Sequence, residues 1–404
     1  MKKKHTTLGL ILALALGLFS GYFHFTATDY AAKALSSIFM NFLQMISVPI
    51  VFLSITATVT KMESLSEMKS FGLKIIKYTL ITTIIAATIA LLLYLGLDPA
   101  QTSIETSSSI ATMPQGGYLD ALQKIVPSNL FQAFGENNVI GVAFFAFALS
   151  FAILLLPKNN KETLHHFFSS LFSAFLKLAG FIVKLLPLAI WAFTTLLVQD
   201  LLSKEVSFKV LGLYIACVVG ANLIQGVIVL PIILLIKKNS PKKLFKAMSE
   251  ALLIAFFTKS SNAALPVSMK CAEEKYGMSP KVCSISFPLC SVINMNACAA
   301  FILITTLFVS AHNGITFSLF ELIGWIFIST VAAIGNAGVP MGCYFLSTAL
   351  LTSMGVPLHI MGLILPFYAF LDMLETGINV WSDSCIAANV DKEIKEAAAA
   401  VEMA

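Results

Sequence analysis

Near its C-terminus the chain carries polar side chains inside an otherwise apolar segment. The acidic ones are Asp372, Glu375 and Asp383, and the neutral ones are Thr376 and Asn379. At about 100° per helical residue, four of the five fall within roughly 60° of arc, with Glu375 about 60° to one side. Together they would form one polar stripe about 16 Å long.

Carboxylates inside an apolar helix are costly, at roughly 2.5–3.5 kcal/mol each near the centre of a membrane span. Three on one face imply compensation by bound cations, by a positively charged ligand group or by protonation. The structural alternative packs these acids against a neighbouring lysine, and few candidates lie at that depth, namely Lys177, Lys184 and Lys259. We expect no enzyme, because Asp372 and Asp383 would lie about 16 Å apart and no nucleophile–base or metal motif accompanies them.

A second polar group lies in the preceding apolar segment, where Asn294 and Asn296 flank Met295. Residues two apart cannot both face one way on a regular helix. The pair therefore predicts a local unwinding that frees backbone carbonyls to coordinate a cation. Asparagines that hydrogen-bond between two helices are the plainer alternative.

The composition indicates that most of this chain is surrounded by lipid. Of 404 residues, 58% are hydrophobic and 12% are charged, whereas soluble domains run near 25% charged. All 26 basic residues are lysine, so no site can clamp a carboxylate with a guanidinium group. The net charge of +5 does not indicate a nucleic-acid partner, because the lysines gather in the loops expected on one side of the membrane.

The cysteines and histidines suggest no metal chemistry. The six histidines form no ligand motif, and no two cysteines form a CxxC pair. Small fillers of membrane helices, with neither a disulfide nor a metal site, are the expected role of the seven cysteines. These are Cys217, Cys271, Cys283, Cys290, Cys298, Cys343 and Cys385.

Apolar segments long enough to cross a bilayer alternate with polar loops. The first exceeds the apolar core of a signal peptide and lacks a convincing cleavage pattern, so we expect a membrane helix. With the N-terminus in the cytoplasm, the lysine-bearing loops at 61–77, 158–161 and 237–246 all fall inside, and the net-negative loop 98–138 falls outside. The fifth segment is long and should be strongly tilted. The six segments are 8–25, 36–60, 73–97, 139–156, 167–202 and 208–236.

The later segments are interrupted. Segment 247–269 is broken by Thr258–Asn262 and by Pro266, and segment 318–354 by Gly335–Pro340. Such breaks expose backbone groups that lipid cannot satisfy, so they must line a cavity or pack within protein. There are two such interrupted segments, and each is followed by a full span, the first at 281–310 and the second at 357–388. This arrangement indicates an inverted repeat around a binding site at the membrane midplane. A pair of kinked ordinary helices is the alternative.

Several of these motifs resemble a known family. The run Asn294–Cys298 resembles the Asn-Met-Asp-Gly-Thr motif of the dicarboxylate/amino acid:cation symporters, the glutamate-transporter family. Thr258–Pro266 and Ala337–Pro340 resemble that family's two hairpin tips, and Leu371–Asp383 resembles its final helix. The resemblance extends from about residue 10 to 390 and includes two earlier segments, Ser47–Phe52 and Lys74–Thr83.

The resemblance implies an all-α polytopic membrane protein with eight transmembrane helices and two re-entrant helical hairpins, an inverted-repeat elevator transporter. It also implies a homotrimer in a bacterial inner membrane, with both termini in the cytoplasm. Residues 1–72 and 139–210 would be scaffold helices 1–2 and 4–5. The transport domain would consist of helix 3 with the extracellular loop (73–138), helix 6 (211–240) and a core of two hairpins with helices 7 and 8 (241–390). Residues 391–404 would be a cytoplasmic tail.

The function implied is secondary active transport of an amino acid coupled to sodium ions or protons, with no other cofactor. Asp372 would hold the substrate's amino group and Asn379 its carboxylate region, and the backbone at Ser261 and Val339 would complete the cradle. The implied substrate residues are Ser260, Ser261, Asn262, Val339, Asp372, Glu375, Thr376 and Asn379. The implied sodium ligands are Cys290, Asn294, Asn379 and Asp383 at one site, Thr82, Thr83 and Asn296 at another, and the backbone near Asn336 at a third.

The chain departs from the family pattern at three places. Asn296 replaces the motif's aspartate, which predicts fewer coupled sodium ions or a weaker site. Ala297 and Cys298 replace its glycine and threonine and narrow the unwound region. Glu375 stands where acidic-substrate members have an arginine.

The Glu375 departure bears on the substrate. At 4 Å two like charges repel by about 4 kcal/mol at an effective dielectric of 20, and Lys259 is a poorer carboxylate clamp than an arginine. We therefore expect a neutral or cationic amino acid, or a neutral polar one bound by a protonated Glu375. Glutamate, aspartate or a C4-dicarboxylate is the alternative within the family, and an ion channel is the alternative outside it.

Overall fold

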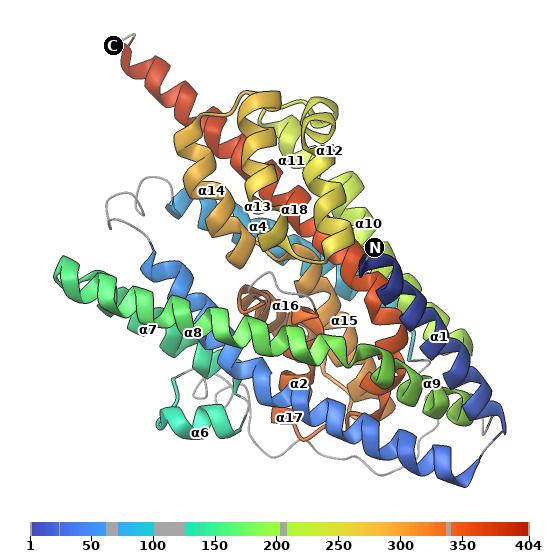
Figure 1. Ribbon diagram of the computed structural model, residues 1–404. Coiled ribbons are helices and arrows are strands. Elements are labelled where there is room, and N and C mark those ends of the chain that lie inside the picture. The colour runs from blue at the N-terminus through green and yellow to red at the C-terminus, as the bar shows by residue number, and fades with distance from the viewer. Residues whose placement is uncertain are drawn as a thin grey trace.

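A computed structural model describes residues 2–23, 25–61, 72–100, 126–136, 138–202, 208–336 and 341–402 (Figure 1). Every regular element in these ranges is a helix, as predicted. The helices of the first half are α1 (Lys2–Phe23), α2 (Thr26–Thr60), α4 (Leu73–Leu97), α6 (Leu130–Gly135), α7 (Val139–Leu154), α8 (Lys158–Lys184) and α9 (Leu186–Leu202). Those of the second half are α10 (Phe208–Ile224), η2 (Gln225–Val229), α11 (Leu230–Ile236), α12 (Pro241–Thr258), α13 (Ser261–Lys270), η3 (Cys271–Tyr276), α14 (Pro280–Ile293), α15 (Asn296–His312), α16 (Leu319–Ile334), α17 (Gly342–Ser353) and α18 (His359–Glu402).

Several of these helices can cross a bilayer. Among the described residues, five helical stretches are long and apolar enough, or six if the bent α8–α9 pair counts as one span. Shorter apolar stretches lie in α1, α7 and α16. The chain is therefore a multi-pass membrane protein, and the count of eight spans remains a prediction.

The segment expected to form one strongly tilted span, 167–202, is instead bent. Helices α8 and α9 meet at 50° around Leu185. Pro187 stands in the first turn of α9 and has no N–H to donate to the carbonyl four residues earlier. A proline of this kind accounts for the bend, which length alone does not reveal.

The helices fall into two packed sets (Figure 1). In one set, α1 packs on α9, and α2 packs on α7, α8 and α9. In the other set, α4 packs on α10 and α15, and α18 packs on α12 and α14. Helix α17 touches both sets, because it packs on α2 and on α15.

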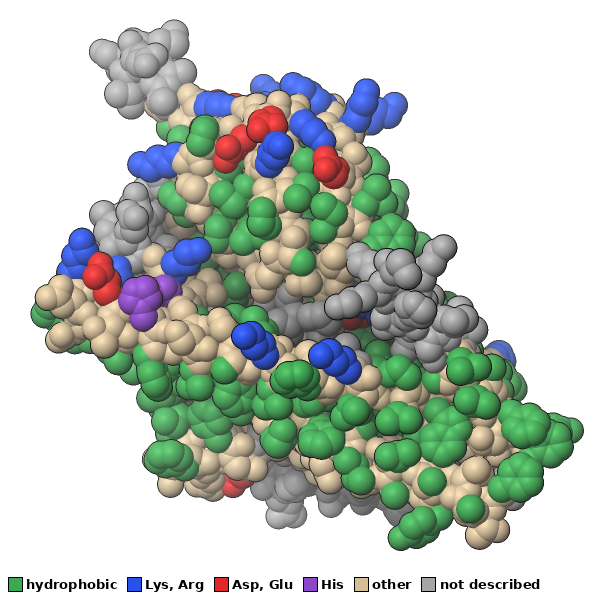
Figure 2. Space-filling model, in the orientation of Figure 1, with side chains coloured by type: hydrophobic (Ala, Val, Ile, Leu, Met, Phe, Trp, Pro, Cys, Tyr) green, Lys and Arg blue, Asp and Glu red, His purple; other side chains and the backbone are tan. Residues whose placement is uncertain are grey.

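Helix α15 is the centre of the second set. Every residue from Asn296 to Ser310 is buried, and α4, α10, α16, α17 and α18 all pack against it. Figure 2 shows lysine and acidic side chains gathered at the end of the molecule where α11 and α12 lie, and mostly hydrophobic side chains over α1, α2 and α9. Exposed apolar residues such as Leu12, Phe19 and Phe23 fit contact with lipid.

A pair of glycines spaced four apart positions α1 against α9. A Cβ on Gly17 would lie 2.7 Å from Thr194 Cβ, and one on Gly21 would lie 2.6 Å from the Thr195 carbonyl oxygen and from Val198 Cβ. Small residues at this spacing let two membrane helices approach closely. The two glycines are visible in the sequence, but the sequence alone does not show which helix they contact.

We predict that Gly21→Ala lowers the melting temperature of the purified protein in detergent. The added methyl group meets backbone and a β-branched side chain, and overpacking of this kind costs about 1–3 kcal/mol. Gly180→Ala is the matched control, because nothing lies within 4 Å of its Cβ position and it gains up to about 1 kcal/mol of helix propensity. Equal melting temperatures for the two variants would contradict the close α1–α9 contact.

Candidate functional site

The first interrupted segment is broken within Thr258–Asn262, as the sequence predicts, but the break expected at Pro266 was wrong. Pro266 lies inside α13, where it removes one backbone donor without ending the helix. Helix α12 ends at Thr258, and Lys259 turns the chain through the left-handed region (φ 56°, ψ 35°). Ser260 then caps α13, since its hydroxyl accepts a hydrogen bond from the Ala263 amide at 3.3 Å. Ser261, the first residue of α13, is buried with 3% of its surface exposed. The break thus brings two hydroxyls to the tip of a helical hairpin.

The tip of this hairpin faces two surroundings. Helices α12 and α13 both pack on α18, the helix that carries the acidic stripe. Asn262 lines a cavity of about 290 Å³ whose wall includes Lys61 and His165. Of the candidate substrate residues of this hairpin, Asn262 therefore lies at the cavity beside α2 and α8.

The second predicted unwinding, at Asn294 and Met295, is also confirmed. Helix α14 ends at Ile293 and α15 begins at Asn296, with non-helical torsions at Asn294 (φ −98°, ψ 76°) and Met295 (φ −114°, ψ 61°). The Asn294 side chain donates to Asp383 Oδ1 at 2.8 Å and to Ser382 Oγ at 2.9 Å. The break is thereby joined to the far end of the stripe on α18.

The Asn296 side chain is fully engaged in hydrogen bonds. Its Oδ1 accepts from Thr82 Oγ1 at 3.2 Å and from Thr83 Oγ1 at 2.7 Å, and its Nδ2 donates to Ser382. The structure therefore brings together the three residues expected at one cation site. Asn296 is neutral, and its amide oxygen accepts from both threonine hydroxyls, so the negative charge of the family motif's aspartate is absent from this cluster.

The stripe on α18 lies inside the protein. Asp372, Glu375, Thr376, Asn379 and Asp383 are each no more than 7% exposed. Asn379 Oδ1 accepts from the Ala297 amide at 3.0 Å, so α18 also holds the first turn of α15. Polar groups buried in this way must find partners within the protein.

The two acids at the start of the stripe have different partners. Asp372 Oδ2 accepts from the Met341 amide at 3.2 Å, which ties it to the residue before α17. Glu375 Oε2 accepts from Tyr368 Oη at 3.3 Å. No donor among the described residues reaches Glu375 Oε1, which is buried. A ligand that donates hydrogen bonds would satisfy this oxygen.

Asn336, beside the second break, lies among sulfur atoms. Its Nδ2 donates to Cys298 Sγ at 2.8 Å and lies 3.6 Å from Cys343 Sγ. Gly342 makes room for this amide, because a Cβ there would collide with the Asn336 side chain. The expected contribution of Val339 lies outside the described residues. The Cys290 carbonyl, expected as a ligand, accepts the Asn294 backbone N–H at 2.8 Å.

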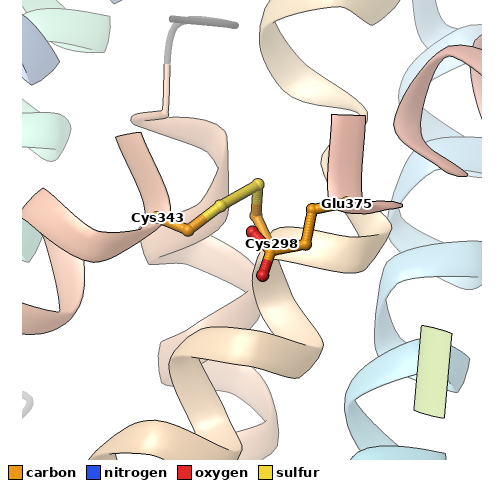
Figure 3. Close-up of side chains that lie close together, drawn as sticks. All are labelled: Cys298, Cys343 and Glu375. Carbon is orange, nitrogen blue, oxygen red and sulfur yellow. A yellow bond between two sulfur atoms is a disulfide. The ribbon is translucent and has the colours of Figure 1, made fainter. Parts of the chain in front are cut away.

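The expectation that no cysteine forms a disulfide was wrong. Cys298 of α15 and Cys343 of α17 are joined, and the other five cysteines are free and buried. Figure 3 shows the pair with the Glu375 side chain reaching toward it, and the ligand atoms of these three residues lie within 4.8 Å of one another. Sequence gave no signal, because the two cysteines are 45 residues apart and only the fold brings them together.

Ser382, Tyr368 and Met341 were also missed. Ser382 binds both Asn294 and Asn296, and its place next to Asp383 could have suggested it. Tyr368 precedes Glu375 by seven residues, which puts both on one helix face. The Met341 contact runs through a backbone amide and leaves no mark in residue type.

Broken helices around a buried polar stripe define a membrane transport protein of the secondary-transporter class. The family model described as the sodium:dicarboxylate symporter family matches residues 7–393, and the chain belongs to that family. Its predicted family is thereby confirmed.

The relatives that this chain resembles are amino acid transporters. It is 26% identical over 382 residues to the neutral amino acid transporter B(0) of Oryctolagus cuniculus, covering 85% of this chain and 70% of that protein. It is 26% identical over 459 residues to the excitatory amino acid transporter 3 of the same species, covering 98% and 87%. The Bos taurus neutral amino acid transporter B(0) is 25% identical over 411 residues, covering 92% and 76%.

We predict that Asn296→Asp makes the stability of the protein depend more strongly on sodium. An uncompensated carboxylate in this buried cluster costs about 3–5 kcal/mol, so the melting temperature should fall in choline buffer and recover when sodium binds. The measurement is thermal unfolding in detergent across a sodium titration.

Asn389→Asp is the matched control. Asn389 is also fully buried on α18, but it pairs with Asn239, outside the candidate cation clusters. Its aspartate variant should be destabilised without recovery in sodium. If both variants recover equally, Asn296 has no special relation to a cation site.

Proposed function

We propose that the protein is a secondary active symporter that couples a neutral or cationic amino acid to sodium. The observation that carries the substrate class is Glu375, a carboxylate that is 1% exposed, with one oxygen that no described donor reaches. The family membership supports a symporter, and the relatives' names cover both neutral and excitatory amino acid transporters.

The charges around Glu375 favour a substrate that brings hydrogen-bond donors or positive charge. Glu375 accepts a hydrogen bond from Tyr368 and lies about one helical turn from a second acid, Asp372, on α18. The chain has no arginine to neutralise a substrate's side-chain carboxylate. At a separation of 4 Å, repulsion of about 4 kcal/mol would weaken binding of an acidic amino acid about a thousandfold.

Within this proposal Asp372 binds the substrate ammonium, and Asn379, with Ser261, receives its carboxylate region. Ser260, Asn262 and Thr376 complete the wall, and Val339 is kept as a proposed backbone contact. Asp383 with the carbonyls of Cys290, Asn294 and Asn379 is the proposed first sodium site. The backbone near Asn336 is proposed as a second sodium site. The cluster of Thr82, Thr83 and Asn296 is proposed as a third sodium site that binds more weakly. Fewer coupled ions than three per substrate follow from the neutral Asn296.

The transport cycle we propose is an elevator. The set formed by α4 and α10–α18 would carry the solute past the scaffold α1, α2 and α7–α9, which corresponds to the two packed sets in Figure 1. Eight spans, two re-entrant hairpins, a homotrimer and a bacterial inner membrane with cytoplasmic termini complete the proposal. The lysine distribution supports this orientation, since exposed Lys238 precedes α12 and exposed Lys242, Lys243 and Lys246 lie in its first two turns.

We predict that neutral or basic amino acids, and not aspartate or glutamate, are the solutes taken up. Purified protein in liposomes is tested with each of the twenty labelled amino acids under an inward sodium gradient, with choline and with a proton gradient as comparisons. Uptake should saturate and need sodium. Uptake that is linear in concentration would indicate a channel, and high-affinity aspartate uptake would refute the charge argument.

We predict that Glu375→Arg shifts the preference toward acidic amino acids, because it reverses the charge that faces the substrate side chain. Competition by aspartate against the solute identified above is measured for both proteins. Glu250→Gln is the matched control, since Glu250 is exposed and pairs with Lys275 at 2.7 Å, far along the chain from the stripe. A variant that binds aspartate no better than the parent would count against Glu375 as the residue that selects the side chain.

A further inference from the structure

The Cys298–Cys343 disulfide joins two helix starts that border the candidate site. Cys298 lies in the first turn of α15, directly after the Asn294–Met295 break. Cys343 lies in the first turn of α17, the later helix of the second interrupted segment. Their Cα atoms are 5.4 Å apart, within the range that a disulfide spans without moving the backbone. The backbone spacing of these two helices is therefore compatible with the bond.

The same two sulfurs contact side chains assigned above to the substrate and the ions. Asn379 Nδ2 donates to Cys298 Sγ at 3.3 Å, and Asn336 Nδ2 donates to it at 2.8 Å. The Glu375 carboxylate lies within 4.8 Å of both sulfurs. A chemical change at this pair would consequently be felt at the site itself.

Access to the site requires a movement that this bond opposes. Asp372 and Glu375 are 4% and 1% exposed, so a solute reaches them only when helices that cover them separate. At its start α17 is held to α18 by the Met341–Asp372 hydrogen bond, which can break and re-form readily. The covalent link to α15 cannot open in this way.

We propose that Cys298 and Cys343 are a reversible dithiol–disulfide switch, whose oxidised form ties α17 to α15 and makes opening of the site rarer. The reduced form leaves the two helices free to separate. This inference rests on the proposed transport function for its consequence, but the chemistry of the pair can be measured without it.

The oxidant required is a small-molecule disulfide. One cysteine thiolate attacks a sulfur of that disulfide, forming a mixed disulfide and releasing one thiol. The second thiolate then displaces the other thiol and forms the Cys298–Cys343 bond. Two electrons and two protons pass from the cysteine pair to two small thiols, and an excess of a dithiol reductant reverses both steps.

The first experiment counts thiols and follows backbone opening on the purified full chain. After treatment with dithiodipyridine the unfolded protein should show five free thiols and a Cys298–Cys343 linked peptide by mass spectrometry, and after dithiothreitol seven. Hydrogen exchange at the first turn of α17 should be slower in the oxidised form.

The second experiment measures uptake in liposomes with the amino acid panel. Oxidation should lower uptake about tenfold, because the site opens more rarely, and prolonged treatment with dithiothreitol, which reaches the bond during these openings, should restore it. Cys298→Ser and Cys343→Ser should each lose the response to the oxidant, whereas Cys217→Ser, on α10, should keep it.

The outcomes separate this proposal from the transport function. If seven thiols remain after oxidation, or if the bond forms but changes neither hydrogen exchange nor uptake, the switch is refuted. If the reduced protein takes up no amino acid but exchange still follows the redox state, the transport function fails while the switch stands.

Discussion

The structure depends on the requirement that polar groups inside a membrane protein find partners within the protein. Lipid offers no hydrogen bonds, so broken backbone and buried acids must lie against one another. At the Asn294–Met295 break the Asn294 side chain donates to Ser382 and Asp383 of α18, and Asn379 of α18 accepts from the Ala297 amide just beyond it. At the start of α17 the Met341 amide donates to Asp372. These two interruptions thus meet the stripe on α18.

This mutual dependence explains why α15 and α18 form the interior. Helix α15 is buried along nearly its whole length, and its first turn is held by Asn379 through the Ala297 amide. A helix surrounded on all sides by protein can carry amides and hydroxyls that a lipid-facing helix cannot. The peripheral helices α1, α2 and α9 show the opposite pattern, with apolar side chains outward (Figure 2).

The sequence predicted the elements and the breaks, but it did not predict partners. Helical periodicity placed Asp372 to Asp383 on one face, and polar tips at Ser260 and Asn294 located the interruptions, because these are local properties. The Cys298–Cys343 bond and the role of Ser382 are set by the packing of distant helices, which periodicity does not encode. The bend at Leu185 had a local cause, Pro187, but the long apolar run around it dominated the prediction.

Two residue differences from the family motif act together on the charge of the site. Asn296 removes a negative charge from the proposed third sodium site, and its amide is hydrogen-bonded to Thr82, Thr83 and Ser382. Glu375 adds a negative charge where the solute's side chain is proposed to bind. The number of acids in the interior is therefore kept, while one is moved from an ion position to the solute position. A positively charged solute would then compensate Glu375, whereas in family members that keep the motif's aspartate an additional ion would compensate that acid. The substrate class and the number of coupled ions are therefore linked through the charge of the buried site.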